Sequence, residues 1–269
     1  MTDGNELASG TTVTNGRTLA SGIEMTNGSG VAKSHLKSLH DTQVSVEKFR
    51  ISLSNRVSAL SRGVDDAERP VPAIYADLAR MADEMEAQID KEIARGLADI
   101  PVWDHWLSHV KGVGPSLAGQ MLALLLPPAP LYGPSSWYKA AGLAPEQRPD
   151  GLMRLPRARA GEGKITYHPW LRRCLWNLAT SFVRNGGYYR TTYEARKAEL
   201  VAAHSGDEQW PLHRLDSVAR WKMVKLFLAH LWERWLEAEG QGEGRRAYVI
   251  DKLGHHYQAP PEWSGNGKI

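Results

Sequence analysis

The chain has 269 residues, of which 42% are hydrophobic and 23% are charged, and its formal net charge is +3. This composition is typical of a globular protein with one large or two small domains, and it excludes a disordered chain. Because the net charge is small, the distribution of the basic residues decides whether nucleic acid is a candidate ligand. The single cysteine, Cys174, excludes an intrachain disulfide and a cysteine-based zinc site, and we expect a buried, inert thiol.

The sequence carries no signal for a membrane or for a common cofactor. No apolar run approaches the roughly 20 residues that a membrane helix needs, and the N-terminal residues lack the apolar stretch of a signal peptide. We therefore expect a soluble, cytoplasmic, nucleoid-associated protein without a membrane partner. A P-loop, a dinucleotide fingerprint and a nucleophile elbow are missing, so we predict no cofactor, no metal site and no catalytic residue.

Two long amphipathic helices are expected in the first part of the chain. Residues 1–33 are rich in Gly, Thr, Ser and Asn and are predicted to be a disordered tail. The segment 34–98 has apolar residues at spacings of three and four on both sides of a Gly- and Pro-containing break: Val46, Phe49, Leu53, Val57 and Leu60, then Tyr75, Leu78, Met81, Met85 and Ile89. This pattern predicts a helical hairpin, which either acts as a coiled-coil arm or packs on the downstream domain.

The rest of the chain is predicted to be mainly α-helical. Residues 99–252 contain a helix–turn–helix over 103–125, a short helix from 135, a basic loop over 146–169, and three further helices that begin near 169, 185 and 213. Almost no segment has the alternating pattern of a strand. Residues 253–269 are expected to form an extended, polar tail.

Two glycines stand one residue apart in the stretch "HWLSHVKGVGPSLAGQMLALL". Flanked by apolar residues, they match the pattern of a helix-hairpin-helix, in which Gly112 permits a positive φ and Val113 packs back onto the helices. Gly114 would let a phosphate approach the N–H groups that begin the second helix, and Lys111 and Ser116 would add contacts. A plain corner with a glycine cap explains the same residues without a ligand.

Basic side chains follow this hairpin and are candidates for phosphate contacts: Arg154, Arg157, Arg159, Lys164, Arg172 and Arg173. A solvated charged loop that binds nothing is the alternative. In the final helix, Arg220, Lys222 and Lys225 lie beside an apolar stripe and would extend a basic surface, although packing of the stripe explains the helix by itself. The segment "RNGGYYRTTYEARK" either stacks on bases or covers a helix junction.

Three segments together carry a resemblance to a known family. "VKGVGPSLAGQMLALL", "SSWYKAAGLAPE" and "GKITYHPWLRRCLWNLA", in this order over residues 103–185, resemble the C-terminal domain of the DEDD insertion-sequence transposases, relatives of the Piv and MooV invertases. The resemblance implies DNA binding, a mobile-element origin and a homodimer formed through residues 35–96. That family also has a RuvC-like metal domain, for which residues 1–33 are too short, and a serine after the "GLAP" segment, where this chain has Arg148 to Leu152 without serine.

We therefore expect a DNA-binding protein, an accessory or domesticated relative of a transposase, that grips the backbone of duplex or branched DNA and is not by itself an enzyme. One alternative is an active transposase or recombinase that is completed by a partner or by an unrecognised metal site. The other is a structural interaction module, or a binder of structured guide RNA, since some members of the family use one.

Overall fold

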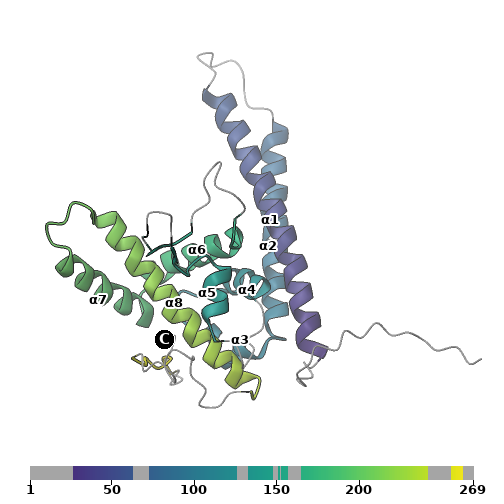
Figure 1. Ribbon diagram of the computed structural model, residues 1–269. Coiled ribbons are helices and arrows are strands. Elements are labelled where there is room, and N and C mark those ends of the chain that lie inside the picture. Colours follow the sequence, from purple (N-terminus) through teal and green to yellow (C-terminus); the bar gives the residue numbers. More distant parts are fainter. Residues whose placement is uncertain are drawn as a thin grey trace, which may run out of the picture.

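The computed structural model describes residues 27–62, 73–125, 133–147, 151, 153–156, 165–241 and 256–262, with the backbone alone for 27–33 and 62. Within these ranges the helices are α1 (Asn27–Arg62), α2 (Ala73–Leu97), α3 (Pro101–His105), a 3₁₀ turn (Leu107–His109), α4 (Pro115–Leu124), α5 (Ser135–Ala140), α6 (Pro169–Asn185), α7 (Tyr188–Ala203) and α8 (Leu212–Ala238). Two short strands, β1 (Glu146–Gln147) and β2 (Met153–Arg154), pair in antiparallel register. The predicted mainly helical class is confirmed (Figure 1).

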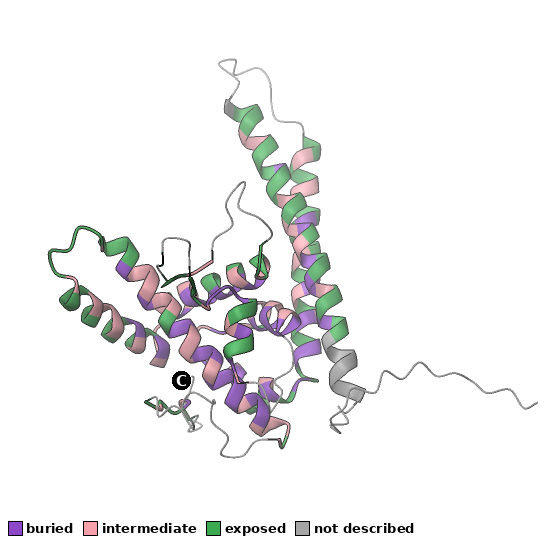
Figure 2. Ribbon diagram, viewed as in Figure 1, coloured by how far each residue is buried: buried purple, intermediate pink, exposed green. Residues whose placement is uncertain are grey.

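Helices α1 and α2 lie side by side and extend beyond the other helices (Figure 1). Their direction is antiparallel, because residues progressively later in α1 meet residues progressively earlier in α2. Gln43 donates to Asp90 at 2.8 Å, and Arg50 donates to Glu86 at 2.9 Å. The outer part of this pair is largely exposed, whereas most of its buried residues lie in the part near the other helices (Figure 2).

Helix α4 connects the long helix pair to the rest of the molecule, since it packs against α1, α2 and α6. The contact with α2 is very close: a Cβ added at Gly119 would lie 2.2 Å from the Cγ2 methyl of Ile93. Ile93 is fully buried, so the absence of a side chain at position 119 sets the distance between the two helices. The α1–α2 pair is thus attached to the rest of the molecule through α4.

Helix α8 forms the centre of the remaining helices and packs against α3, α6 and α7. Its apolar face includes Phe227 and Leu231, both fully buried. Residues 256–262, part of the expected polar tail, pack on this body without regular secondary structure, since Trp106 donates to the carbonyl of Pro261 at 3.0 Å. The tertiary contacts of these residues decide their position, which their polar composition does not indicate.

Several boundaries differ from the sequence-based expectations. Helix α1 begins at Asn27, inside the range expected to be a tail; once packing has formed a helix, each further residue adds a hydrogen bond at little cost. The predicted stripe of α2 is wrong in part, because Met81 and Met85 are about half exposed while Ala82 and Ile93 are buried. The basic loop contains the β1–β2 hairpin. Residues 1–26 and 63–72 lie outside the described residues.

Candidate functional site

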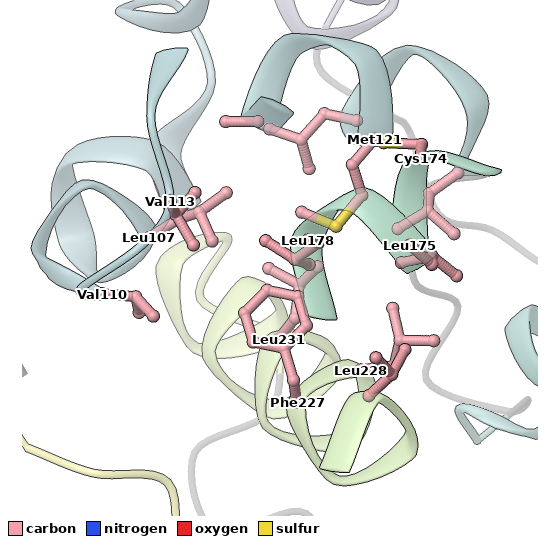
Figure 3. Close-up of a cluster of buried hydrophobic side chains, with 14 of the residues drawn as sticks. Leu107, Val110, Val113, Met121, Cys174, Leu175, Leu178, Phe227, Leu228 and Leu231 are labelled. Atoms are coloured by element: carbon pink, nitrogen blue, oxygen red, sulfur yellow. The ribbon is translucent and has the colours of Figure 1, made fainter. Parts of the chain in front are cut away.

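The turn at the two glycines has a specific backbone geometry. Gly112 has a φ of +92°, and the N–H of Val113 donates to the carbonyl of Val110 at 3.1 Å. A type II turn needs such a positive φ at its third residue, which explains the glycine. Val113 is buried, and Figure 3 shows it beside Leu107 in the apolar cluster that also includes residues of α6 and α8. Before the turn, the chain forms the short α3 and one 3₁₀ turn instead of one continuous helix.

Gly112 and Gly114 have different surroundings. A Cβ at Gly112 would lie 3.1 Å from a ring carbon of Phe182 and 3.3 Å from the carbonyl oxygen of Ser181, whose hydroxyl donates to the Gly112 carbonyl at 2.6 Å. A Cβ at Gly114, the N-cap of α4, would have no neighbour within 4 Å. Gly112 therefore serves the packing of the turn on α6, whereas the backbone at Gly114 is open to approach.

Helix α1 occupies part of the surface at the start of α4. The Ser116 hydroxyl accepts a hydrogen bond from the Gln43 amide at 3.3 Å, and the Gln43 carbonyl oxygen accepts one from Gln120 at 3.1 Å. Ser116 is therefore engaged with α1, while Lys111 is exposed. Of the residues expected to contact a phosphate at this turn, Lys111 and Gly114 remain accessible.

A second group of predicted residues lines a cavity of about 610 Å³ between the β1–β2 hairpin, α6 and the first half of α8. Five cationic side chains line it: Arg154, Arg172, Arg214, Lys222 and Lys225. None of the described residues that line it is acidic. Burial and the charge of Lys222 lower the pKa of Lys225, and burial together with Arg196 lowers that of Lys222. The described wall of the cavity thus concentrates positive charge.

Aromatic rings and backbone carbonyls hold two of these guanidinium groups in place. Arg172 lies over Tyr167, 5.0 Å from the ring centre, and over Trp221 at 5.5 Å, and it donates to the carbonyls of Gly142 and Pro156. Arg214 lies 4.0 Å from the ring centre of Trp210. Each arrangement restricts the guanidinium to one place, so less conformational entropy is lost when an anion binds.

The cavity includes residues that the sequence reasoning did not select, namely Trp210, His213, Arg214 and Trp221. Their signal in the sequence is the spacing of basic and aromatic residues along α8, where Arg214, Trp221 and Lys225 are separated by seven and four positions and thus share one side of the helix. Arg157, Arg159 and Lys164 of the predicted basic loop lie outside the described residues.

The predicted residues do not form one surface. From Arg172 to Ser181, which packs on the turn, α6 makes about two and a half turns, so the two side chains leave opposite sides of the helix about 14 Å apart along its axis. Arg173 takes a third direction and pairs with Glu47 of α1 at 2.8 Å. The cavity and the glycine turn are therefore separate surfaces.

The tyrosines that follow α6 have structural roles. Tyr189 and Tyr193 are buried, and the Tyr189 hydroxyl lies 2.9 Å from Nδ1 of His230. Nε2 of His230 donates to the carbonyl of Gln258 at 2.9 Å, so Nδ1 of the neutral ring accepts from the tyrosine. Burial lowers the pKa of His230 to about 4. These tyrosines cover a helix junction and are not available for base stacking.

Cys174 is buried, and burial raises its pKa to about 12, in agreement with an inert thiol. Within the described ranges, no three His, Cys, Asp or Glu side chains gather in a way that could hold a metal ion. No helix of the described part of the chain has the length and apolar character to cross a bilayer. Comparisons of the chain with protein-family models, with curated proteins and with solved structures found no match.

Proposed function

We propose that the protein binds nucleic acid through its phosphate groups and that the cationic cavity beside α8 is the main contact. The observation that carries this proposal is the gathering of five cationic side chains on the described wall of one cavity. Like charges held close together repel one another, and a polyanion relieves this repulsion. Phosphate contacts of Arg and Lys supply most of the affinity in sequence-independent binding to nucleic acid.

DNA is the polyanion that the sequence favours. The resemblance of residues 103–185 to the transposase domain supports DNA, duplex or branched, and the role of an accessory or domesticated relative of a transposase. The open backbone at Gly114 and the exposed Lys111 are compatible with a second, weaker phosphate contact of the helix-hairpin-helix type. Because this turn lies on another side of α6, a single straight backbone does not reach both contacts.

The test is a salt series. Binding of the purified protein to labelled duplex DNA is measured by fluorescence anisotropy at increasing salt, for the wild type and for the double variant Arg214→Gln/Lys222→Met. The logarithm of the affinity falls linearly with that of the salt concentration, with a slope of about −0.9 for each phosphate contacted. The double variant is expected to bind more weakly and to have a slope that is shallower by about two.

A matched control removes the same charge elsewhere. Arg80→Gln/Lys91→Met changes two exposed positions of α2 and is expected to leave the slope unchanged. Equal slopes for the wild type and the cavity variant would contradict the cavity as the contact. Absence of salt-dependent binding to any nucleic acid would contradict the function and favour a protein-interaction module. Strand cleavage with added magnesium would instead identify an active recombinase.

A further inference from the structure

We infer that the cationic cavity receives an unpaired nucleotide, whose phosphate meets the cationic side chains and whose base and sugar lie against the apolar wall. This inference rests on the proposed binding of nucleic acid and adds the form of nucleic acid that the site prefers. The volume of about 610 Å³ is in the range of pockets that enclose a ligand of nucleotide size. It is far larger than one phosphate group requires.

The wall of the cavity is amphipathic. Beside the cationic side chains it contains Leu143, Pro145, Leu155, Val218 and Trp221, with Met153 at 63% exposure. A site that contacts phosphates alone has no need of such a surface, because phosphates are fully polar. Apolar surface next to fixed cations fits a ligand with one anionic and one weakly polar part, which is the chemical character of a nucleotide.

Paired nucleic acid does not fill such a cavity. In a duplex the phosphates lie on the convex outside and the bases are stacked within, so a duplex touches the rim and leaves the apolar wall exposed to water. An unpaired nucleotide, at a strand end or a junction, presents its base without the cost of unstacking. Burial of that base then adds binding free energy that a blunt duplex does not gain.

The aromatic side chains limit how the base is bound. The ring centres of Trp210 and His204 lie 4.0 Å apart, and the Arg214 guanidinium lies 4.0 Å from the Trp210 ring centre. Trp221 lies against Trp176 and beneath Arg172. These rings fix the cations and are not free platforms, so the base contacts mainly the aliphatic wall. Contacts of that kind do not read hydrogen-bonding edges, and we expect little preference among the four bases.

The experiment compares a blunt duplex with the same duplex that carries a short single-stranded overhang, at one salt concentration. The wild type is expected to bind the overhang duplex about tenfold more tightly, as the burial of one base against the apolar wall allows. Ser217→Phe fills the cavity from α8 and leaves every charge in place. It is expected to remove the preference for the overhang, while binding of the blunt duplex remains salt-dependent.

Two further variants make the result decisive. Ser54→Phe, at an exposed position of α1, is the matched control and should retain the preference. Ser217→Leu intrudes less and replaces Ser217→Phe if circular dichroism shows that the larger side chain disturbs the fold. A nucleoside monophosphate should displace the overhang duplex from the wild type at lower concentration than inorganic phosphate does.

The outcomes separate this inference from the proposed function. Equal, salt-dependent binding of both duplexes by the wild type would overturn the inference and leave the function standing. A preference that survives in both Ser217 variants would also overturn it, because the base would then bind elsewhere. No binding of either duplex at low salt would overturn both. A preference that is lost with the filled cavity alone would establish the pocket.

Discussion

The two glycines of the turn should respond differently to the same substitution, Gly→Ala. At Gly112 an alanine must adopt a φ near +92°, which costs about 1–2 kcal/mol for a residue with a Cβ. The new Cβ would also press on the Phe182 ring at 3.1 Å and on the Ser181 carbonyl oxygen at 3.3 Å. That oxygen belongs to the backbone of α6 and cannot withdraw alone, so overpacking adds about 1–2 kcal/mol.

At Gly114 the same substitution should change the free energy of unfolding very little. The residue has a φ of −102° and a ψ of 167°, which alanine adopts readily, and the Cβ points into open space. Alanine restricts the unfolded chain, which stabilises the fold by about 0.4–1 kcal/mol, but it is a poorer N-cap than glycine by a similar amount. The free energy of unfolding should therefore stay within about 1 kcal/mol of the wild-type value.

Urea denaturation followed by circular dichroism measures both free energies. Gly112→Ala should lose about 2–4 kcal/mol, equivalent to a Tm lower by roughly 4–16 °C for a chain of this size, and Gly114→Ala should unfold like the wild type. Equal losses in the two variants, or a fully stable Gly112→Ala, would refute this account of the turn. Gly114→Ala is consequently the clean probe of a phosphate contact at α4, because it alone changes the surface without straining the fold.

Two further predictions concern the core. Gly119→Ala should destabilise the protein by about 2 kcal/mol, since its Cβ would lie 2.2 Å from the Ile93 methyl and overpacking outweighs the gain in helix propensity. Adding Ile93→Leu, which lacks that branched methyl, should restore part of the lost stability in a urea titration. A single variant as stable as the wild type would contradict this packing. Burial lowers the pKa of His230 from its ordinary value of 6.5 to about 4 in the folded protein. The neutral ring therefore contributes to the free energy of unfolding, and this contribution is fully present above pH 6.5. It is lost as the pH falls towards 4, by up to about 3 kcal/mol. A comparison of the stability of the wild type and His230→Gln at several pH values isolates this part, and parallel curves would refute it.

Local patterns were sufficient for the helical elements. The spacing of apolar residues, the prolines and the glycines predicted α4 to α8 to within a few residues, because hydrogen bonding within a helix and its termination depend on neighbouring residues. Gly112 is the clearest case, since a sharp turn between two apolar segments needs a positive φ whatever lies around it.

Local patterns were insufficient to predict which face of a helix packs against its neighbours. Met81 and Met85 continue an apolar stripe along α2, yet they are about half exposed. The register of α2 against α1 and α4 is set by long-range contacts, of which Ile93 against Gly119 is the closest. The two small β-strands also escaped prediction, because each has only two residues and the pairing itself creates the element.

The sequence alone determined that this protein is mainly helical, that a glycine turn precedes α4 and that basic residues follow it. The tertiary structure decided where those residues point. It engaged Ser116 with α1, paired Arg173 with Glu47, and brought Arg154 and Arg172 together with Lys222 and Lys225 of α8. The physical reason is that helix formation is a property of adjacent residues, whereas a binding cavity forms between elements that meet only when the whole core packs.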